Sequence, residues 1–323
     1  MQNLTYGYAF WQAAAEEMLR DSRVFLMGED IDNNKALVEA VGKERVRGCP
    51  ISESAFIGAS IGAAATGLRP IVWLMYGSFM YVAMDQLVNQ AAKLRYMTGG
   101  QFNLPIVYWC PIGSGFAGAA QHSDHPTALF INSPGFKVIL PSNVYDAMGL
   151  FRSAVRDDNP VIVFEEQGLS ESPGEIPESD YIIPIGKGAI RQAGTDVTVV
   201  AVGAMVPQAI TAAEKLREEG ISLEIVDPRT LVPMDKQLIL NSVRKTGRLV
   251  IFEDAPPLCS FASEVAATVA QEGFDLLHGP IIRVTREHFP VPFSPVLENH
   301  VIANEKKLIT AIRQLLTSWH PKL

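Results

Sequence analysis

Apolar runs of strand length alternate with segments of helical periodicity along almost the whole chain. The first series of runs is short and nearly continuous, as expected of strands buried on both faces of a sheet. These runs are Val24–Met27, Ile71–Met75, Ile106–Trp109, Val138–Leu140 and Val161–Phe164. The helices predicted between them are Tyr8–Arg20, Glu53–Thr66, Met80–Tyr96 and Asn143–Arg156. Because parallel strands need long crossovers, the alternation predicts an α/β fold with a mostly parallel sheet covered on both faces.

A second series of the same kind follows in the carboxy-terminal half. Its predicted strands are Val197–Val202, Leu223–Val226, Leu249–Glu253 and Ile281–Val284. Its predicted helices are Val206–Glu219, Lys236–Val243, Ser260–Gln271 and Lys306–Leu316. The segment Gly168–Pro184 separates the two series; it is acidic and holds three prolines and two glycines, a composition that ends helices and central strands. We therefore predict two domains, 1–180 and 185–323, a division that suits a chain of 323 residues.

Composition excludes several classes of protein. A hydrophobic content of 48% with 19% charged residues excludes intrinsic disorder, and a formal charge of -8 argues against a nucleic-acid or anionic-membrane binder. Cys49, Cys110 and Cys259 form no CxxC pair, which gives no support for a disulfide framework or a zinc knuckle. The amino terminus lacks a signal-peptide pattern, and the longest strongly apolar stretch, Ile71–Met84, is too short to span a bilayer. We expect a soluble, cytoplasmic protein.

The region from Pro70 to Phe136 carries very little charge. Its only formal charges are Asp85, Lys93, Arg95 and Asp124, whereas the chain average of 19% would give about three times as many. A large core explains uncharged strands, but it does not explain an uncharged glycine-rich loop such as residues 111–120. We therefore expect an extensive subunit interface with a site opening onto it.

Glu53 begins a predicted helix of small residues, in which Gly58 and Gly62 lie four apart on one face and permit close approach of another helix. An acid at such a position is ordinarily a charge that favours the helix dipole, and the residues alone favour this interpretation. The functional alternative is a carboxylate held among apolar groups with a demanding hydrogen-bond partner.

His122 directly follows the glycine-rich loop, within the charge-poor region. An imidazole at the end of a flexible apolar loop is well placed for proton transfer. His125 precedes a proline and is compatible with a turn; the pair of histidines lacks a further ligand cluster, so metal binding is not favoured. The chain also lacks GxxxxGK[ST], GxSxG and a GxGxxG that opens a helix after a strand. Any phosphorylated cofactor must have its diphosphate held by another means.

Several motifs, in order along the chain, together resemble one known family. They are Pro50-Ile51-Ser52-Glu53, Asp85-Gln86, Ala91-Ala92-Lys93, Tyr96-Met97-Thr98-Gly99-Gly100-Gln101-Phe102, Gln121-His122-Ser123, Pro134-Gly135-Phe136-Lys137-Val138, Arg156-Asp157-Asp158-Asn159-Pro160, Asp227-Pro228-Arg229-Thr230-Leu231, Arg283-Val284-Thr285 and Pro290-Val291-Pro292-Phe293. The chain resembles the beta subunit of the 2-oxo acid dehydrogenase decarboxylating component, from pyruvate, branched-chain and acetoin dehydrogenases. The resemblance implies a thiamine-diphosphate pyrimidine-type domain followed by a transketolase C-terminal-like domain.

The resemblance also implies roles for individual residues. Glu53 would hydrogen-bond the pyrimidine ring nitrogen of thiamine diphosphate and favour the imino tautomer that removes the thiazolium proton. His122 would face the substrate and its covalent adduct, and Phe79 would pack against the pyrimidine. A potassium site built mostly from backbone carbonyls would comprise Ile106, Ala154, Val155, Asp157 and Asn159.

The family's motif for diphosphate and Mg2+, a GDG followed by Asn, lies in a separate alpha subunit, and no GDG occurs here. The resemblance therefore implies an alpha2-beta2 heterotetramer in which this chain is active only with its alpha subunit. It implies a 2-oxo acid dehydrogenase activity in which a small 2-oxo acid loses carbon dioxide and the acyl group passes to a lipoyl acyltransferase.

Two departures from the family pattern leave room for other activities. The segment after Asp30 is about ten residues shorter than in most relatives, and Val82 stands where pyruvate enzymes often carry Gln. An alternative is the same chemistry used for carboligation, in an acyloin-forming or split transketolase-like enzyme without a lipoyl partner. A third hypothesis is a non-catalytic regulatory subunit, against which the presence of both Glu53 and His122 argues.

Overall fold

The computed structural model describes residues 1–318, which form two compact units. The first unit comprises Met1–Ile112 and Leu129–Ile185; the second comprises Gly113–Ala128 and Gly186 onward. The first predicted domain ends at residue 180 and the second begins at residue 185. The observed units differ from the predicted domains mainly in the segment Gly113–Ala128. This segment packs with the second unit although it follows a strand of the first.

The first unit is an α/β structure whose main strands are all parallel. In sheet order these strands are β6 (Lys137–Ile139), β7 (Val161–Glu166), β5 (Val107–Ile112), β4 (Arg69–Trp73), β2 (Val24–Gly28) and β3 (Val46–Gly48). β1 (Gln2–Thr5) pairs with β8 (Pro173–Ile176) as a separate antiparallel ribbon. All five predicted strands are present, and the predicted parallel α/β class is confirmed. β3 is missed by the hydrophobic pattern because two of its three residues are exposed.

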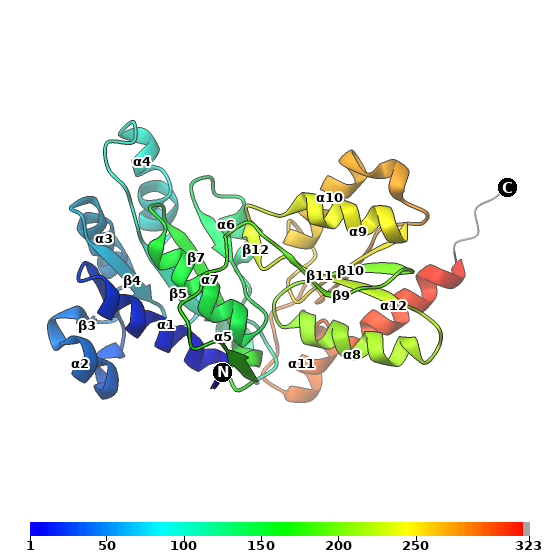
Figure 1. Ribbon diagram of the computed structural model, residues 1–323, viewed down its shortest axis with the longest axis horizontal. Coiled ribbons are helices and arrows are strands. Elements are labelled where there is room, and N and C mark those ends of the chain that lie inside the picture. The colour runs from blue at the N-terminus through cyan, green and yellow to red at the C-terminus, as the bar shows by residue number, and fades with distance from the viewer. Residues whose placement is uncertain (319–323) are drawn as a thin grey trace. The chain divides into compact units, whose positions relative to one another are not determined.

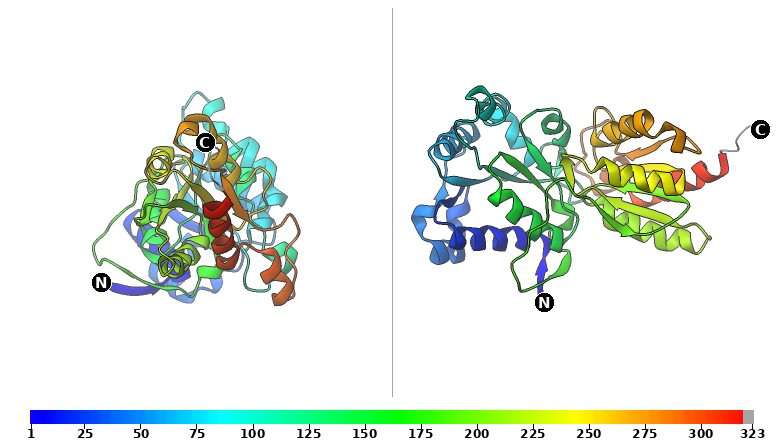
Figure 2. Two further views of the ribbon diagram at one scale, coloured as in Figure 1. Left: turned by 90° about the vertical axis from the view of Figure 1, so that its right-hand side faces the viewer. Right: turned by 45° about the horizontal axis from the view of Figure 1, so that its top comes forward.

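Helices cover both faces of this sheet (Figure 1 and Figure 2). The helices along this part of the chain are α1 (Tyr6–Arg20), α2 (Lys35–Val41), α3 (Glu53–Ala65), α4 (Leu94–Met97), α6 (Thr127–Ile131) and α7 (Val144–Arg156). α1 packs against α7, and the aromatic rings beneath them form a continuous cluster: Phe10 stacks on Trp109 at 5.7 Å, and Trp73 meets Trp109 at 4.4 Å between ring centroids. These interlocked rings bury a large apolar area and fix the two helices on the sheet.

The single helix predicted over Met80–Tyr96 is wrong. The structure has a 3-10 helix, η3 (Gly77–Ala83), then a π-helix, η4 (Asp85–Ala91), and then the short α4. Apolar periodicity over so short a segment does not distinguish these kinds of turn. Both η3 and η4 pack against α3, and this tertiary contact decides the local geometry. Such π-turns often occur at functional sites.

The second unit has a mixed sheet in the order β14 (Ile282–Thr285), β13 (Leu249–Glu253), β10 (Val197–Ala201), β11 (Leu223–Asp227) and β9 (Ala189–Gln192). Of these five strands, β9 alone runs antiparallel to its neighbour, β11. The remaining elements are α5 (Ala119–His122), α8 (Met205–Arg217), β12 (Thr230–Val232), α9 (Lys236–Thr246), α10 (Phe261–Glu272), α11 (Pro295–Val301) and α12 (Glu305–Ser318). The four predicted strands and four predicted helices of this half are present.

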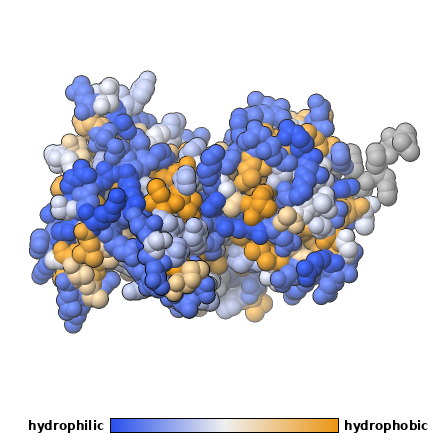
Figure 3. Space-filling model, viewed as in Figure 1, coloured by the Kyte–Doolittle hydropathy of each residue, from blue (hydrophilic) through white to orange (hydrophobic). Residues whose placement is uncertain are grey.

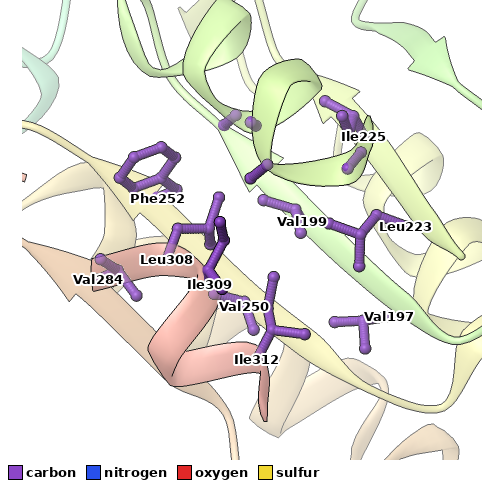
Figure 4. Packing of buried hydrophobic residues seen from close by; sticks show 14 of the residues in the cluster. Val197, Val199, Leu223, Ile225, Val250, Phe252, Val284, Leu308, Ile309 and Ile312 are labelled. Carbon is purple, nitrogen blue, oxygen red and sulfur yellow. The ribbon is translucent and has the colours of Figure 1, made fainter. Parts of the chain in front are cut away.

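The core of the second unit lies between this sheet and the helices α8 and α12. Leu308, Ile309 and Ile312 of α12 point toward Val250 and the neighbouring strands (Figure 4). The β-branched strand residues of this core and the α12 side chains that belong to it are almost completely buried. α11 precedes α12 in the chain and carries a buried glutamate, Glu298, described below.

Candidate active site

Glu53 is the first residue of α3 and is only 7% exposed. A carboxylate that served only the helix dipole would have no reason to leave water. The next residue, Ser54, donates a hydrogen bond from Oγ to the Val82 carbonyl at 2.8 Å, which joins the first turn of α3 to η3. Phe79 lies in η3 and meets Tyr76 edge to face at 5.4 Å between ring centroids. The fold therefore brings together the elements that carry Glu53 and Phe79.

A second buried acid, Glu29, lies beside Glu53. It directly follows β2, at the carboxyl end of a parallel strand, where α/β proteins commonly place ligand sites. Burial raises the pKa of Glu29, and the nearby charge of Glu53 and a hydrogen bond to Glu53 raise it further. Among residues 1–318, Glu29 Oε1 has no hydrogen-bond partner. The two carboxyl groups therefore share a buried environment in which one oxygen of Glu29 is open to a further partner.

The backbone before Glu29 is tightly constrained. A Cβ at Gly28 would lie 2.3 Å from the Trp73 carbonyl oxygen of β4, so only glycine fits there. Glu29 also lines a cavity of about 370 Å³ within the first unit. The other lining residues are Trp11, Asp30, Ile31, Asn34, Trp73, Met75, Tyr76, Pro111 and Gln167. Glu29 is not among the site residues predicted from the sequence, although an acid directly after a buried strand is a signal that indicates it.

The segments joined at Glu53 expose large apolar side chains. Ile51 is 84% exposed and Val82 67% exposed, and Tyr81 is also exposed. The face of the molecule drawn in Figure 3 shows several apolar areas among hydrophilic ones. Large exposed apolar side chains next to a buried acid are typical of a surface that another chain covers.

His122 ends the short helix α5, in the segment that packs with the second unit, and its side chain is half-buried. His125 is buried rather than placed in an open turn, and its Nδ1 lies 3.1 Å from Thr127 Oγ1. His125 also faces the buried Glu253, whose pKa is raised by burial and lowered in part by the charge of His125. His125 is thus an internal polar residue of the second unit.

The residues expected to form a potassium site gather where α7 ends. The carbonyls of Val155 and Asp157 both accept hydrogen bonds from the guanidinium of Arg69, at 2.9 and 2.6 Å, and the Asp157 carboxylate pairs with Lys137. The Ile106 carbonyl accepts from Val161 N at 2.8 Å, and the Ala154 carbonyl from Asp157 N at 3.2 Å. Carbonyl oxygens at a helix C-terminus suit a hard cation. In this structure Arg69 and Lys137 already place positive charge beside two of these residues, Val155 and Asp157.

Residues 2–172 match the transketolase pyrimidine-binding domain family, and residues 186–308 match the transketolase C-terminal domain family. The beta subunit of acetoin:2,6-dichlorophenolindophenol oxidoreductase from Bacillus subtilis is 44% identical over 318 residues, covering 93% of each chain. The chain belongs to the 2-oxo acid dehydrogenase beta-subunit family. This confirms the resemblance carried by the motifs.

Other members of the family show the same end-to-end match. The 2-oxoisovalerate dehydrogenase beta subunit of Bacillus subtilis is 39% identical over 324 residues, covering 98% of this chain and 99% of that one. A solved structure described as a split-gene transketolase, inactive beta4 tetramer, has a TM-score of 0.82 at 22% identity, covering 98% of this chain and 99% of the other; it supports the fold. The family is thiamine-diphosphate-dependent. In the described part of the chain, no helix has the length and apolarity needed to cross a membrane.

Proposed function

We propose that this chain is the beta subunit of a heteromeric, thiamine-diphosphate-dependent 2-oxo acid decarboxylase that passes its acyl group to a lipoyl acyltransferase. The observation that carries the proposal is the buried acid pair Glu53 and Glu29, in a chain that matches family members from end to end. A structural subunit would gain nothing from two carboxyl groups buried side by side, since each loses hydration.

The acid pair fits the aminopyrimidine of thiamine diphosphate. A buried carboxylate suits a pyrimidine ring nitrogen that carries a proton, and Phe79 on the adjacent η3 offers an aromatic face. When bound, this cofactor supplies a thiazolium carbon that adds to a 2-oxo acid and accepts the electrons released with carbon dioxide. Glu53 would hold the proton at the ring nitrogen, and Glu29 would donate to Glu53 and keep it oriented.

His122 is proposed to face the substrate and to transfer a proton to or from its oxygen atoms. Its half-buried position lets an imidazole reach a ligand while keeping part of the ring packed. We propose the domain limits 1–180 and 185–323 for the folded chain, with Gly113–Ala128 contributed to the second unit so that His122 is carried by it.

The diphosphate and Mg2+ are proposed to be held by an alpha subunit, within an alpha2-beta2 heterotetramer. The absence of a phosphate motif and the exposed Ile51, Tyr81 and Val82 beside Glu53 support this division of the site. The isolated chain should therefore bind thiamine diphosphate weakly or not at all. Calorimetry that gave micromolar or tighter binding to the purified chain alone would contradict the proposal.

We propose a potassium ion at the C-terminal end of α7, where it would share carbonyl oxygens with Arg69. Potassium chloride should then raise the melting temperature of the assembled enzyme more than sodium or choline chloride at equal ionic strength. Equal stabilisation by the three salts would assign these oxygens to Arg69 and Lys137 alone.

The experiment that tests the function is co-expression with the alpha subunit, followed by a substrate screen. Pyruvate and 2-oxoisovalerate test decarboxylation, and acetoin is included because the relatives named for it are 44% identical. The expected result is carbon dioxide release and acylation of a lipoylated domain, both requiring the two subunits together. Acyloin formation without lipoyl acylation would favour the carboligase alternative, and no turnover with any 2-oxo acid would contradict decarboxylation.

A further inference from the structure

The loop that leads to His122 is fastened by a buried carboxylate far away in the sequence. Glu298 of α11 is only 3% exposed; its Oε1 accepts from Gly115 N at 2.8 Å, and its Oε2 accepts from Ala117 N at 3.0 Å. Both bonds lie within the second unit. A carboxylate that accepts two backbone N–H groups makes charge-assisted bonds, which are stronger and more directional than neutral ones.

The backbone that Glu298 holds is in an unfavourable conformation. Gly115 has φ +96, and Ala117 and Ala119 each have φ +58, a region that alanine rarely adopts. Helix α5 comprises only four residues, which is too short to hold its own shape. The conformation before His122 therefore depends on bonds from outside the loop.

Two further residues complete the attachment. Ser114 Oγ donates to Asp254 Oδ2, while Asp254 Oδ1 accepts from Ala303 N at 3.0 Å. The buried guanidinium of Arg286 donates to the Asp254 carbonyl at 2.9 Å and to the Ser123 carbonyl at 3.1 Å. The bond to Ser123 fastens the residue directly after His122. The loop is thus held on both sides of His122.

We propose that Glu298, Asp254 and Arg286, hereafter the loop clamp, are positioning residues that set the orientation of His122. The proposal rests on the proposed role of His122. None of the three residues is proposed to touch the reacting atoms. Each acts through the backbone of residues 114–123. Proton transfer depends steeply on geometry, so a loosened loop should slow turnover more than it weakens substrate binding.

The test uses the assembled enzyme with alpha subunit and Glu298→Gln. Glutamine keeps the size but replaces one acceptor oxygen with an amino group, so one backbone N–H loses its partner. We expect kcat to fall about 10- to 100-fold with a smaller change in KM. Amide hydrogen exchange over residues 114–123 should quicken at least about tenfold, while β10 and β13 stay protected. The matched control is Glu219→Gln, which removes only an exposed ion pair with Arg313. It should change neither kcat nor the amide exchange of residues 114–123.

A double variant separates positioning of His122 from general stabilisation. If the loop clamp acts through His122, then Glu298→Gln should cost little additional activity in a His122→Ala background. Full multiplication of the two losses, or unchanged exchange over 114–123 in Glu298→Gln, would overturn the proposal. A His122→Ala enzyme of normal turnover would instead overturn the proposed role of His122; faster exchange in Glu298→Gln would still support the clamp as a determinant of loop structure.

Ser114→Ala supplies a second, milder variant should Glu298→Gln fail to assemble. It removes one bond to Asp254 and leaves Glu298 and Arg286 in place. We expect kcat to fall about threefold to tenfold, with exchange quickened at residues 113–117. Wild-type kcat together with wild-type exchange would overturn the proposal.

Discussion

Glu298 and Asp254 of the second unit and Glu29 of the first unit are similarly buried, but their carboxyl oxygens have different partners. In the second unit, both oxygens of Glu298 accept backbone N–H groups, and both oxygens of Asp254 accept hydrogen bonds as well. In the first unit, Glu29 leaves one buried oxygen without a partner among residues 1–318 and lies against another acid, Glu53, which raises its pKa. The groups are similarly buried, but Glu298 and Asp254 are satisfied by their own chain and Glu29 is not.

The difference distinguishes Glu298 and Asp254, which hold backbone groups, from Glu29, which lies beside the candidate catalytic acid Glu53. A carboxylate whose two oxygens both accept hydrogen bonds is held in place and holds its donors, which suits the loop clamp. A buried acid with an open oxygen retains an unmet demand for a donor, which a ligand can meet. Burial alone would have ranked Glu298 and Glu29 alike; the hydrogen-bond partners distinguish them.

The largest expected effect is the loss of turnover on replacing His122, which the second unit carries. His122→Ala should leave assembly and melting temperature unchanged and lower turnover by about two to four orders of magnitude, the usual range for a positioned proton-transfer group. Steady-state kinetics of the assembled enzyme measure it. Turnover within a few-fold of wild type would make His122 structural and leave all the chemistry to the first unit.

Glu53→Gln tests the buried acid pair of the first unit, Glu53 and Glu29. The amide keeps size and packing but removes the charged acceptor, so exchange of the thiazolium proton should slow by about a hundredfold or more. Acid-quenched NMR of the assembled enzyme measures the exchange. Glu264→Gln, in the first turn of α10, is the control for a charge at a helix start. Normal exchange in Glu53→Gln with a stability loss of about 0.3–1 kcal/mol would return Glu53 to a dipole role.

Glu165 extends the comparison to an acid in the core of the first unit. Burial raises its pKa from 4.5 to about 8, although Trp109 Nε1 donates to it at 2.8 Å. The folded state therefore keeps a proton that the unfolded state releases above pH 4.5. The stability from this group is fully present below pH 4.5 and falls as the pH rises to about 8, by about 1.4 kcal/mol per pH unit at most.

Glu165→Gln should remove this dependence while keeping an acceptor for Trp109. Denaturant unfolding of the full chain at several pH values should show the variant gaining stability over wild type between about pH 4.5 and about 8. A constant difference across that range would show that Glu165 titrates normally.

The smallest expected effects are at the helix caps, where the two units should behave alike. Asn143 Oδ1 accepts from Asp146 N at the start of α7, and Asp235 Oδ1 accepts from Leu238 N at the start of α9. Replacing either by Ala should cost about 1 kcal/mol in the free energy of unfolding, measured by urea denaturation. A loss above about 2 kcal/mol in one unit only would show that the caps are coupled to that unit's wider network.

Much of the fold follows from local pattern. The continuous apolar runs of β2, β4, β5 and β10 have no amphipathic face, so they must be buried on both sides, and this requires a parallel sheet covered by helices. The division of residues 77–91 into η3 and η4 does not follow from pattern, because contacts with α3 decide it.

The candidate site also has features that the sequence predicts and features that it does not. Glu53 and His122 were identified by short motifs, because each motif is contiguous in sequence. The uncharged loop at 111–120 was expected to be covered by a partner chain. Some of its hydrogen-bond donors are instead bonded within the chain, by Glu298 and Asp254. The partner of Gly115 and Ala117 lies more than 180 residues away, where no local signal connects them.

The parallel α/β architecture, the family and the two candidate residues follow from the amino-acid sequence alone, because periodicity and short motifs are local properties. The folded structure adds that Glu29 lies against Glu53, that Gly113–Ala128 belongs with the second unit and that Glu298 holds the loop before His122. These features escape local pattern because the state of a buried acid depends on which donors and charges surround it. Those neighbours come from distant parts of the chain and are fixed only when it folds.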